Sequence, residues 1–345
     1  MRRHYTTLAA LGLAVTCGAW SDAAGAQQAR AGGAAQLDFW PVRGNVYMLA
    51  GAGGNVTASV GSDGVLLVDT GTAEASDAVA AALSRLQERL ALAGRLDGVL
   101  DADAAIAAPP RFPNYTHAPV KPVRYVINTS ARLDHSGANA ALAAPRNGGA
   151  AAPVIAQENV LIRLVSGEAP FERLPTETFS SGEHVLGNAF NGDRIRLIHV
   201  PAAVTDGDTM VYFRAADIIS TGDVFSMESF PVIDVNSGGS IDGVIRALNA
   251  ILRLAIPEAY GEGGTLIVPG HGRLADSADV GYYRDMLTII REQVRNAIDS
   301  GMTLDQIRVL RPTLGFEGRF GAESSGWTAD MFLEAVYRSL REPLQ

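Results

Sequence analysis

Residues 128–139 read NTSARLDHSGAN, and they directly follow the apolar run VRYVIN, which has the composition of a β-strand. Loops that leave the end of a strand often carry functional residues. In an extended chain alternate side chains point the same way, so we expect Ser130, Arg132 and Asp134 to share one face beside His135. The segment predicts a polar site at a strand end. The alternative is that the Asp-His pair only hydrogen-bonds a tight turn.

On both sides of this segment, short β-type runs alternate with amphipathic helices. Before it, runs separated by glycines and a Ser-Asp-Gly turn predict mostly antiparallel strands at 45–50, 55–61 and 64–71, then a helix at 74–92. From it onward we expect a strand at 123–128, a helix at 136–144, strands at 153–157, 194–200, 209–213 and 265–270, and helices at 241–254, 280–298 and 331–340. Strands and helices are mixed without a linker, which predicts one α/β domain.

A proline-rich stretch at residues 94–122 interrupts this pattern. Its prolines are incompatible with regular structure. Long irregular loops in compact domains are often functional, so we expect this loop to border a pocket.

The N-terminal residues 1–26 have the features of a cleaved signal peptide, namely two arginines, the apolar run LAALGLAV and a small-residue stretch before the cleavage point. We therefore expect a periplasmic or secreted protein with a flexible segment at 27–40 and a folded domain at 41–345. Cys17 is the only cysteine and lies inside the signal, so the mature chain has no disulfide and no cysteine nucleophile. Lipid anchoring at Cys17 is the alternative, but the residues before it match a lipoprotein signal poorly.

The composition limits the kinds of partner. With 345 residues, 47% of them hydrophobic, the chain is long enough to bury a large core. The net charge of -9 and the lack of a Lys/Arg-rich run exclude a nucleic-acid role. No stretch reaches the roughly 20 apolar residues that a membrane span needs. A small-molecule substrate or ligand is the partner we expect, and the sequence leaves the oligomeric state open.

Over nearly the whole mature chain, the sequence resembles the metallo-β-lactamase superfamily. That superfamily carries H-x-H-x-D-H where this chain has residues 130–135. GVLLVDTG matches an early strand that ends in an aspartate, here Asp69, and PAAVTDGDTMVYF has Val204 where the family has a histidine. STGDVF carries the family's bridging aspartate at Asp223, and VPGHG carries its last ligand at His271.

The resemblance implies an αββα sandwich with a two-metal site at one edge of the sheets. The first metal takes three histidines, for which this chain has Ser130, Arg132 and Val204. Serine is a poor zinc ligand, valine is none, and arginine has no lone pair to donate, so this half of the site should be absent.

The ligands of the second metal are all retained: Asp134, His135 and His271, with Asp223 as the bridge. Two imidazoles and two carboxylates suit zinc, so the resemblance implies at most one zinc ion per chain, with Asp134 as the candidate catalytic residue. One zinc ion can lower the pKa of a bound water molecule to roughly 7, so the loss of one metal does not by itself abolish hydrolysis. We expect Asp69 to hold a loop behind these ligands.

The charge of Arg132 suggests a further hypothesis. If its guanidinium lies where the first metal would be, it pairs with Asp223 or with an anionic group of a substrate. We consider His117 and His199 as replacement ligands, and Ser130 with His135 as a serine nucleophile and its base. No G-x-S-x-G motif supports the serine mechanism.

Two functions of different class follow from these residues. The first is a single-metal hydrolase acting on an ester, thioester, lactam or phosphoester, and it is favoured by the retained Asp/His/His set. The second is a pseudoenzyme that keeps the fold to bind a small molecule or a protein partner, and it is favoured by the loss of the three-histidine set. The fold alone does not decide between them.

Overall fold

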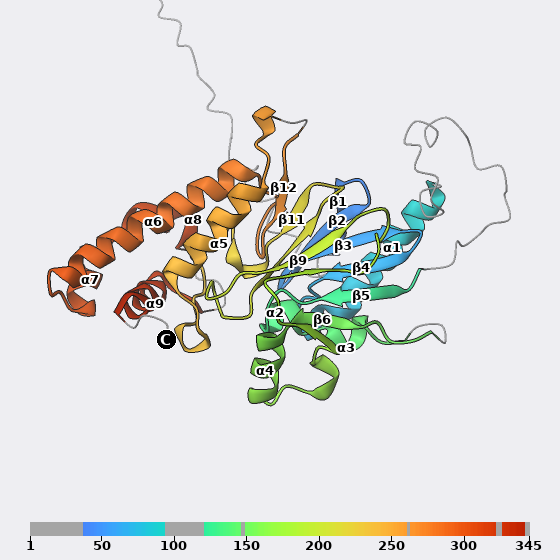
Figure 1. The fold of residues 1–345 in the computed structure, drawn as a ribbon, viewed down its shortest axis with the longest axis horizontal. Coiled ribbons are helices and arrows are strands. Elements are labelled where there is room, and N and C mark those ends of the chain that lie inside the picture. Colours follow the sequence, from blue (N-terminus) through green and yellow to red (C-terminus); the bar gives the residue numbers. More distant parts are fainter. Residues whose placement is uncertain (1–36, 94–120, 146–148, 261–262, 322–325, 342–345) are drawn as a thin grey trace, which may run out of the picture. The chain divides into compact units, whose positions relative to one another are not determined.

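Two β-sheets pack face to face, with helices on both outer sides (Figure 1). The computed structural model describes residues 37–93, 121–145, 149–260, 263–321 and 326–341. The signal peptide, most of the proline-rich loop and His117 lie outside the described residues. No helix in the described part of the chain is long and apolar enough to cross a membrane.

Sheet A has the strand order β1-β2-β3-β4-β5-β6-β7. Its strands are β1 (Trp40–Arg43), β2 (Val46–Ala52), β3 (Gly54–Gly61), β4 (Gly64–Val68), β5 (Val123–Ile127), β6 (Val154–Gln157) and β7 (Glu177–Phe179). The strands from β2 to β4 pair antiparallel, as predicted, β1 adds an antiparallel strand that was not predicted, and the strands from β4 to β7 pair parallel. All residues of β3 and β4 are buried, because α1 covers one face of the sheet and sheet B covers the other.

Sheet B has the order β12-β11-β10-β9-β8. Its strands are β8 (Glu183–Val185), β9 (Ile195–His199), β10 (Thr209–Phe213), β11 (Ile218–Ser220) and β12 (Leu266–Val268). The strands from β8 to β11 are antiparallel, while β11 and β12 are parallel. Parallel pairing brings the carboxyl ends of β11 and β12 to the same edge of the sheet.

Three hydrophobic layers hold the sandwich together. Leu66 and Ile127 of sheet A meet Leu197 and Phe213 of sheet B in the middle layer. On the outer face of sheet A lies α1 (Ser76–Leu92), whose buried side chains repeat at the helical spacing read from the sequence. On the outer face of sheet B lie α5 (Ile241–Leu254), α6 (Ser277–Asp299) and α9 (Ala329–Arg341). The predicted αββα sandwich is confirmed.

Some local predictions were wrong. The single helix expected at 136–144 is two short helices, α2 (Leu133–Ser136) and α3 (Asn139–Leu142). Because α2 begins at Leu133, the chain is not extended through Asp134. The alternation of side chains in an extended chain therefore does not set the direction of the Asp134 side chain. Three further helices were not predicted: α4 (Glu158–Ser166), α7 (Leu304–Leu310) and α8 (Leu314–Phe320).

Residues 37–39 precede β1 and belong to the same compact unit as the two sheets. Phe39 is buried in the layer beneath α1. Arg89 of α1 donates two hydrogen bonds to the carboxylate of Asp38, at 3.1 and 3.0 Å. These contacts attach the segment before β1 to the domain.

Candidate metal centre

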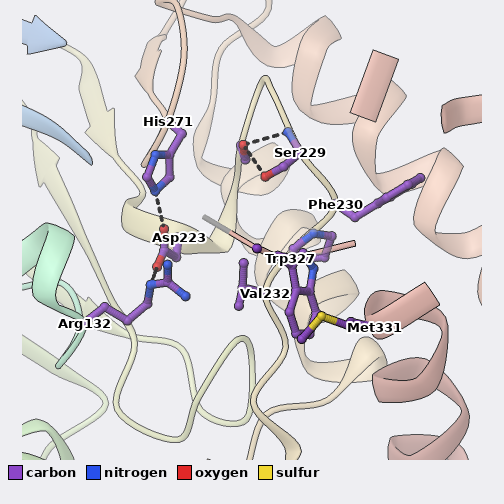
Figure 2. Close-up of a pocket in the computed structure, with 11 residues that line it drawn as sticks. Arg132, Asp223, Ser229, Phe230, Val232, His271, Trp327 and Met331 are labelled. Atoms are coloured by element: carbon purple, nitrogen blue, oxygen red, sulfur yellow. Dashed lines mark hydrogen bonds and ion pairs between the residues drawn. The ribbon is translucent and has the colours of Figure 1, made fainter. Parts of the chain in front are cut away.

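Four side chains predicted as ligands converge where strands of both sheets end. Asp134 and His135 lie in α2 beyond β5, Asp223 lies in a 3-10 turn (Gly222–Val224) beyond β11, and His271 follows β12. Each offers one ligand atom, and these atoms all lie within 4.8 Å of one another. Figure 2 shows His271 and Arg132 approaching Asp223 from opposite sides. Residues far apart in the sequence therefore form one cluster.

Glycines let the two loops of sheet B come this close. Gly222 has φ +52°, a conformation that favours glycine, and a Cβ there would lie 2.4 Å from Oγ1 of Thr129. Gly270 packs against it, since a Cβ on Gly270 would lie 2.7 Å from the carbonyl of Gly222. The residue after each glycine is a candidate ligand, so this close approach sets the separation of Asp223 and His271.

His135 is held by a carboxylate on each side of its ring. Its Nδ1 lies 2.7 Å from Oδ2 of Asp69, and its Nε2 lies 2.9 Å from Oδ1 of Asp223. Asp69 in turn accepts hydrogen bonds from the backbone N–H of Thr129 at 2.8 Å and from its hydroxyl at 2.7 Å. Asp69 therefore fixes both the loop after β5 and the orientation of the imidazole.

His271 approaches the same carboxylates from the other side. Its Nε2 is 3.3 Å from Oδ2 of Asp134 and 3.2 Å from Oδ1 of Asp223. Burial by itself lowers the pKa of His271, but the hydrogen bonds to Asp134 and Asp223 outweigh it and raise the pKa to about 9. In the metal-free protein this imidazole is therefore protonated at neutral pH.

The pKa values of His135, Asp223 and Asp134 also reflect burial opposed by neighbouring charges and hydrogen bonds. Burial by itself lowers the pKa of His135, but the charges of Asp223 and Asp69 raise it well above the usual value. Burial by itself raises the pKa of Asp223, but the charges of His135 and Arg132 hold it well below the usual value. For Asp134, the hydrogen bond from His271 is the largest influence that opposes burial, and the pKa lies below the usual value.

Arg132 lies beside Asp223, as the sequence hypothesis proposed, and also beside Asp134, which the hypothesis did not include. Its Nε is 2.8 Å from Oδ2 of Asp223, and its Nε and Nη2 donate to the two oxygens of Asp134 at 3.2 and 3.1 Å. A guanidinium cannot bind a metal, but it places a permanent positive charge at this edge of the cluster.

The other two changed positions form no part of a ligand set. Ser130 is buried, and its Oγ accepts a hydrogen bond from the backbone N–H of Arg132 at 3.3 Å rather than contacting a base. Val204 is buried and borders a cavity beside Arg132. His199 hydrogen-bonds the carbonyl of Asp206 at 2.7 Å and is not in the cluster, so it is not a replacement ligand.

The cluster fits a single divalent metal ion by two criteria. Two imidazole nitrogens and two carboxylates are a donor set that zinc accepts. In addition, Oδ2 of Asp223 is buried and accepts no hydrogen bond, because the Nε–H of Arg132 is directed at Asp134 although the Nε atom is close. A buried carboxylate oxygen without a donor is unfavourable, and a metal ligand would satisfy it.

Two features of the site were missed at the sequence level. The first is Asp208, which is buried and accepts hydrogen bonds from the backbone N–H and hydroxyl of Thr205 at 2.7 and 2.8 Å. Burial raises the pKa of Asp208 to about 7. The TDGD motif signals this residue, but nothing in the sequence indicates that it is buried.

The second missed feature is the wall opposite Arg132, formed by Phe230, Val232, Trp327 and Met331 (Figure 2). The helix expected at 331–340 was predicted from its apolar spacing. Which of its residues would line a cavity is decided by packing between distant segments, so no local signal points to Met331.

An αββα sandwich with histidine and aspartate ligands gathered at the carboxyl ends of its strands defines a metallo-hydrolase type of fold. The chain belongs to the metallo-β-lactamase superfamily, since the family model of that description matches residues 49–279. A comparison with curated protein sequences gave no match.

Solved structures with a similar fold include two classes of enzyme. A stereoselective inverting sec-alkylsulfatase from a Pseudomonas species has 15% identity and a TM-score of 0.62, over 89% of this chain and 50% of that one. This chain thus spans about half the length of the sulfatase. A metallo-β-lactamase from Pontibacter korlensis has 15% identity and a TM-score of 0.51, over 73% of this chain and 99% of that one. At these identities the likeness concerns the fold alone.

Proposed function

We propose that the protein is a hydrolase that works with one metal ion, zinc, held by Asp134, His135, Asp223 and His271. The observation that carries the proposal is the convergence of these four ligand atoms around the buried, donor-free oxygen of Asp223. The changed positions, Ser130, Arg132 and Val204, fall on the ligands of the other metal, and all four ligands of this set are retained.

When bound, a zinc ion supplies a Lewis acid and lowers the pKa of water to roughly 7. The protein's own residues provide the rest. Asp69 orients His135 through Nδ1, which leaves Nε2 directed at the site. Asp134 stays anionic because its pKa is lowered, so it is a weak base, and its role as the candidate catalytic residue is to hold and orient rather than to take a proton. Arg132 stabilises negative charge that develops on the substrate.

The substrate bond belongs to the set that this chemistry hydrolyses, namely an ester, thioester, lactam or phosphoester of a small molecule. The fold likeness to a sec-alkylsulfatase adds sulfate esters to the compounds worth screening. We also propose that the protein is exported to the periplasm or secreted after cleavage of residues 1–26. The mass of the mature chain, purified from a fractionated host cell, tests this part.

A second candidate is a binding protein without catalysis. The observation that favours it is that Arg132 and His271 already pair with Asp134 and Asp223, so the carboxylate charges are balanced without a metal. Such a protein would bind its ligand equally well with and without zinc.

Elemental analysis of the protein, purified without chelator, separates the two candidates. We expect about one zinc ion per chain in the wild type and in His199→Ala, a matched control outside the cluster, and none in His271→Ala. Chelator should lower the melting temperature of the wild type and of His199→Ala but not that of His271→Ala, because an ion bound to the native state stabilises it by mass action. A wild-type protein that takes up no metal after incubation with zinc contradicts the hydrolase proposal and favours the binding protein.

A further inference from the structure

Two adjoining hollows open beside the candidate metal centre, on the side of α9. The smaller has a volume of about 120 Å³ and includes Asp223 and His271 in its lining. The larger has a volume of about 370 Å³ and extends along α9 as far as Arg338. They share four lining residues: Arg132, Val232, Trp327 and Met331. The two hollows therefore adjoin along these side chains, and Asp223 and His271 line the smaller one.

Two positions at which the chain departs from the family pattern line this space. Arg132 lines both hollows, and Val204 lines the larger one. Arginine and valine provide what a ligand site needs, a fixed charge and an apolar wall. The substitutions that remove the first metal have thus produced the lining of a cavity.

We propose that the joined hollows bind a single-chain amphiphile whose oxyanion head lies on Arg132 and whose apolar chain runs along Val204, Trp327 and Met331. The proposal rests on the proposed hydrolase function only in making this amphiphile the substrate. The head is a carboxylate, sulfate or phosphate, because a guanidinium recognises the oxygens that all three share.

The charge for the head comes from Arg132. Its Nε and Nη2 are engaged by Asp134 and Asp223, whereas Nη1 donates no hydrogen bond to any residue of the described chain. The side chain is 30% exposed. Figure 2 shows the guanidinium facing Val232 and Trp327 across the pocket, so donors remain for a ligand oxygen there.

The walls away from Arg132 suit an alkyl chain. The larger hollow is lined mainly by apolar side chains: Val204, Val232, Ile233, Val235, Trp327, Met331 and Ala335. Its volume of about 370 Å³ lies at the small end of the usual range for ligand pockets, which is enough for one alkyl chain.

The outer rim does not repel an anion. Glu334 is neutralised by Arg308, whose Nη2 lies 2.9 Å from its carboxylate. Arg338 adds a positive charge and donates to Asn236 at 2.8 Å. Asp234 accepts hydrogen bonds from Ser237. Since both signs are present at the rim, Arg132 decides the preference for an anionic head.

A chain-length series tests the proposal. Metal-free and zinc-loaded protein are titrated with butyl, hexyl, octyl and decyl sulfates and carboxylates, and with the matching alcohols. Binding is followed by calorimetry and by the fluorescence of Trp327 in Trp40→Phe protein produced without residues 1–26, which contain Trp20. Each methylene that enters the hollow should tighten binding about three- to fourfold, until the hollow is full. Each anion should bind at least tenfold more tightly than its alcohol.

Three variants locate the two ends of the ligand. Arg132→Gln should bind the anions no better than the alcohols but keep the dependence on chain length. Met331→Glu, on an exposed helix face, should weaken the binding of all long-chain anions at least tenfold. This variant tests the proposal if Arg132→Gln does not fold. Arg338→Gln should change little. Equal affinity for anions and alcohols in the wild type, no effect of chain length, or loss of the anion preference only in Arg338→Gln overturns the proposal.

The outcomes separate this inference from the proposed function. Chain-length-dependent binding by a protein that takes up no zinc supports the amphiphile site and contradicts the hydrolase. Zinc uptake and ester hydrolysis that are indifferent to chain length support the hydrolase and contradict the amphiphile site.

Discussion

Replacing Arg132 by glutamine should change the stability of the metal-free protein and its affinity for zinc in opposite directions. Breaking a buried ion pair by removing one partner costs about 3–5 kcal/mol. Here the cost is smaller, because the Arg132 side chain is 30% exposed and Asp223 keeps His135 and His271 as partners. We expect a loss of about 2–3 kcal/mol, which lowers the melting temperature by about 5–10 °C.

The zinc affinity should rise in the same variant. Like charges about 4 Å apart repel by about 1 kcal/mol in water and by about 4 kcal/mol at an effective dielectric constant of 20. Arg132 is paired with two of the four candidate ligands, Asp134 and Asp223, so its charge opposes a second cation held by them. Removing it should tighten zinc binding about tenfold or more.

Thermal denaturation in chelator and competition titration with a zinc indicator measure the two quantities. The control is Arg196→Gln, which breaks a two-contact ion pair with Glu183 outside the cluster. The Nε and Nη2 atoms of Arg196 each lie 2.6 Å from a carboxylate oxygen of Glu183. Because the Glu183 side chain is 42% exposed, whereas that of Asp223 is 6% exposed, the control should lose about 1 kcal/mol at most and keep its zinc affinity. Unchanged stability and unchanged zinc affinity in Arg132→Gln would refute the reasoning.

Three further predictions concern the pH dependence and the backbone of the site. The raised pKa of His271, about 9, contributes stability in metal-free protein that is complete below pH 6.5 and is lost as the pH rises through 9. Urea denaturation between pH 6.5 and 9 should show that the free energy of unfolding of the metal-free wild type falls by roughly 2–3 kcal/mol, and that this fall is absent in His271→Asn. An equal fall in the variant contradicts the assignment to His271. Asp208 has a pKa raised to about 7, so its contribution is complete below pH 3.8 and is lost as the pH rises through 7. Asp208→Asn should flatten the stability profile between pH 4 and 7, and a profile parallel to the wild type would show that another group is responsible. Gly222→Ala should cost about 2–4 kcal/mol and lower zinc affinity, because φ is +52° and the new Cβ meets Thr129, whereas Gly315→Ala, with nothing within 4 Å, should be neutral or stabilising. Similar melting temperatures for these two variants would mean that the fold does not require the absence of a side chain at position 222.

The sequence predicted the strands and helices of one α/β domain from their periodic signals, but it indicated the αββα sandwich only through the resemblance to a family. The fully buried run of β4 and the spaced leucines of α1 are visible without tertiary information. It also grouped the four candidate ligands, but only through the resemblance to a family, since nothing local links Asp134 to His271.

The missed parts are one local turn and two features that depend on packing between distant segments. The turn at Leu133 ends the extended chain, and local hydrogen bonds such as that from the backbone N–H of Gly137 to the carbonyl of Leu133, at 2.9 Å, favour it over alternation. The cavity beside Arg132 is bordered by Val204 and by Met331 of α9, which lie far apart in the sequence. A single sequence indicates neither the meeting of such segments nor the burial of Asp208.

The ring of His135 joins residues from both halves of the chain. One nitrogen contacts an aspartate 66 positions earlier in sheet A, and the other contacts an aspartate 88 positions later, beyond a strand of sheet B. During synthesis the second contact cannot form until the chain has been made past β11, and contacts between such distant positions form slowly. Until then the imidazole has only one of the two carboxylates that raise its pKa. In the metal-free protein, a proton held between Nε2 of His135 and Asp223 is therefore a marker of complete assembly, and the signal of this Nε2–H in a magnetic resonance spectrum should appear only when the two sheets have closed on each other.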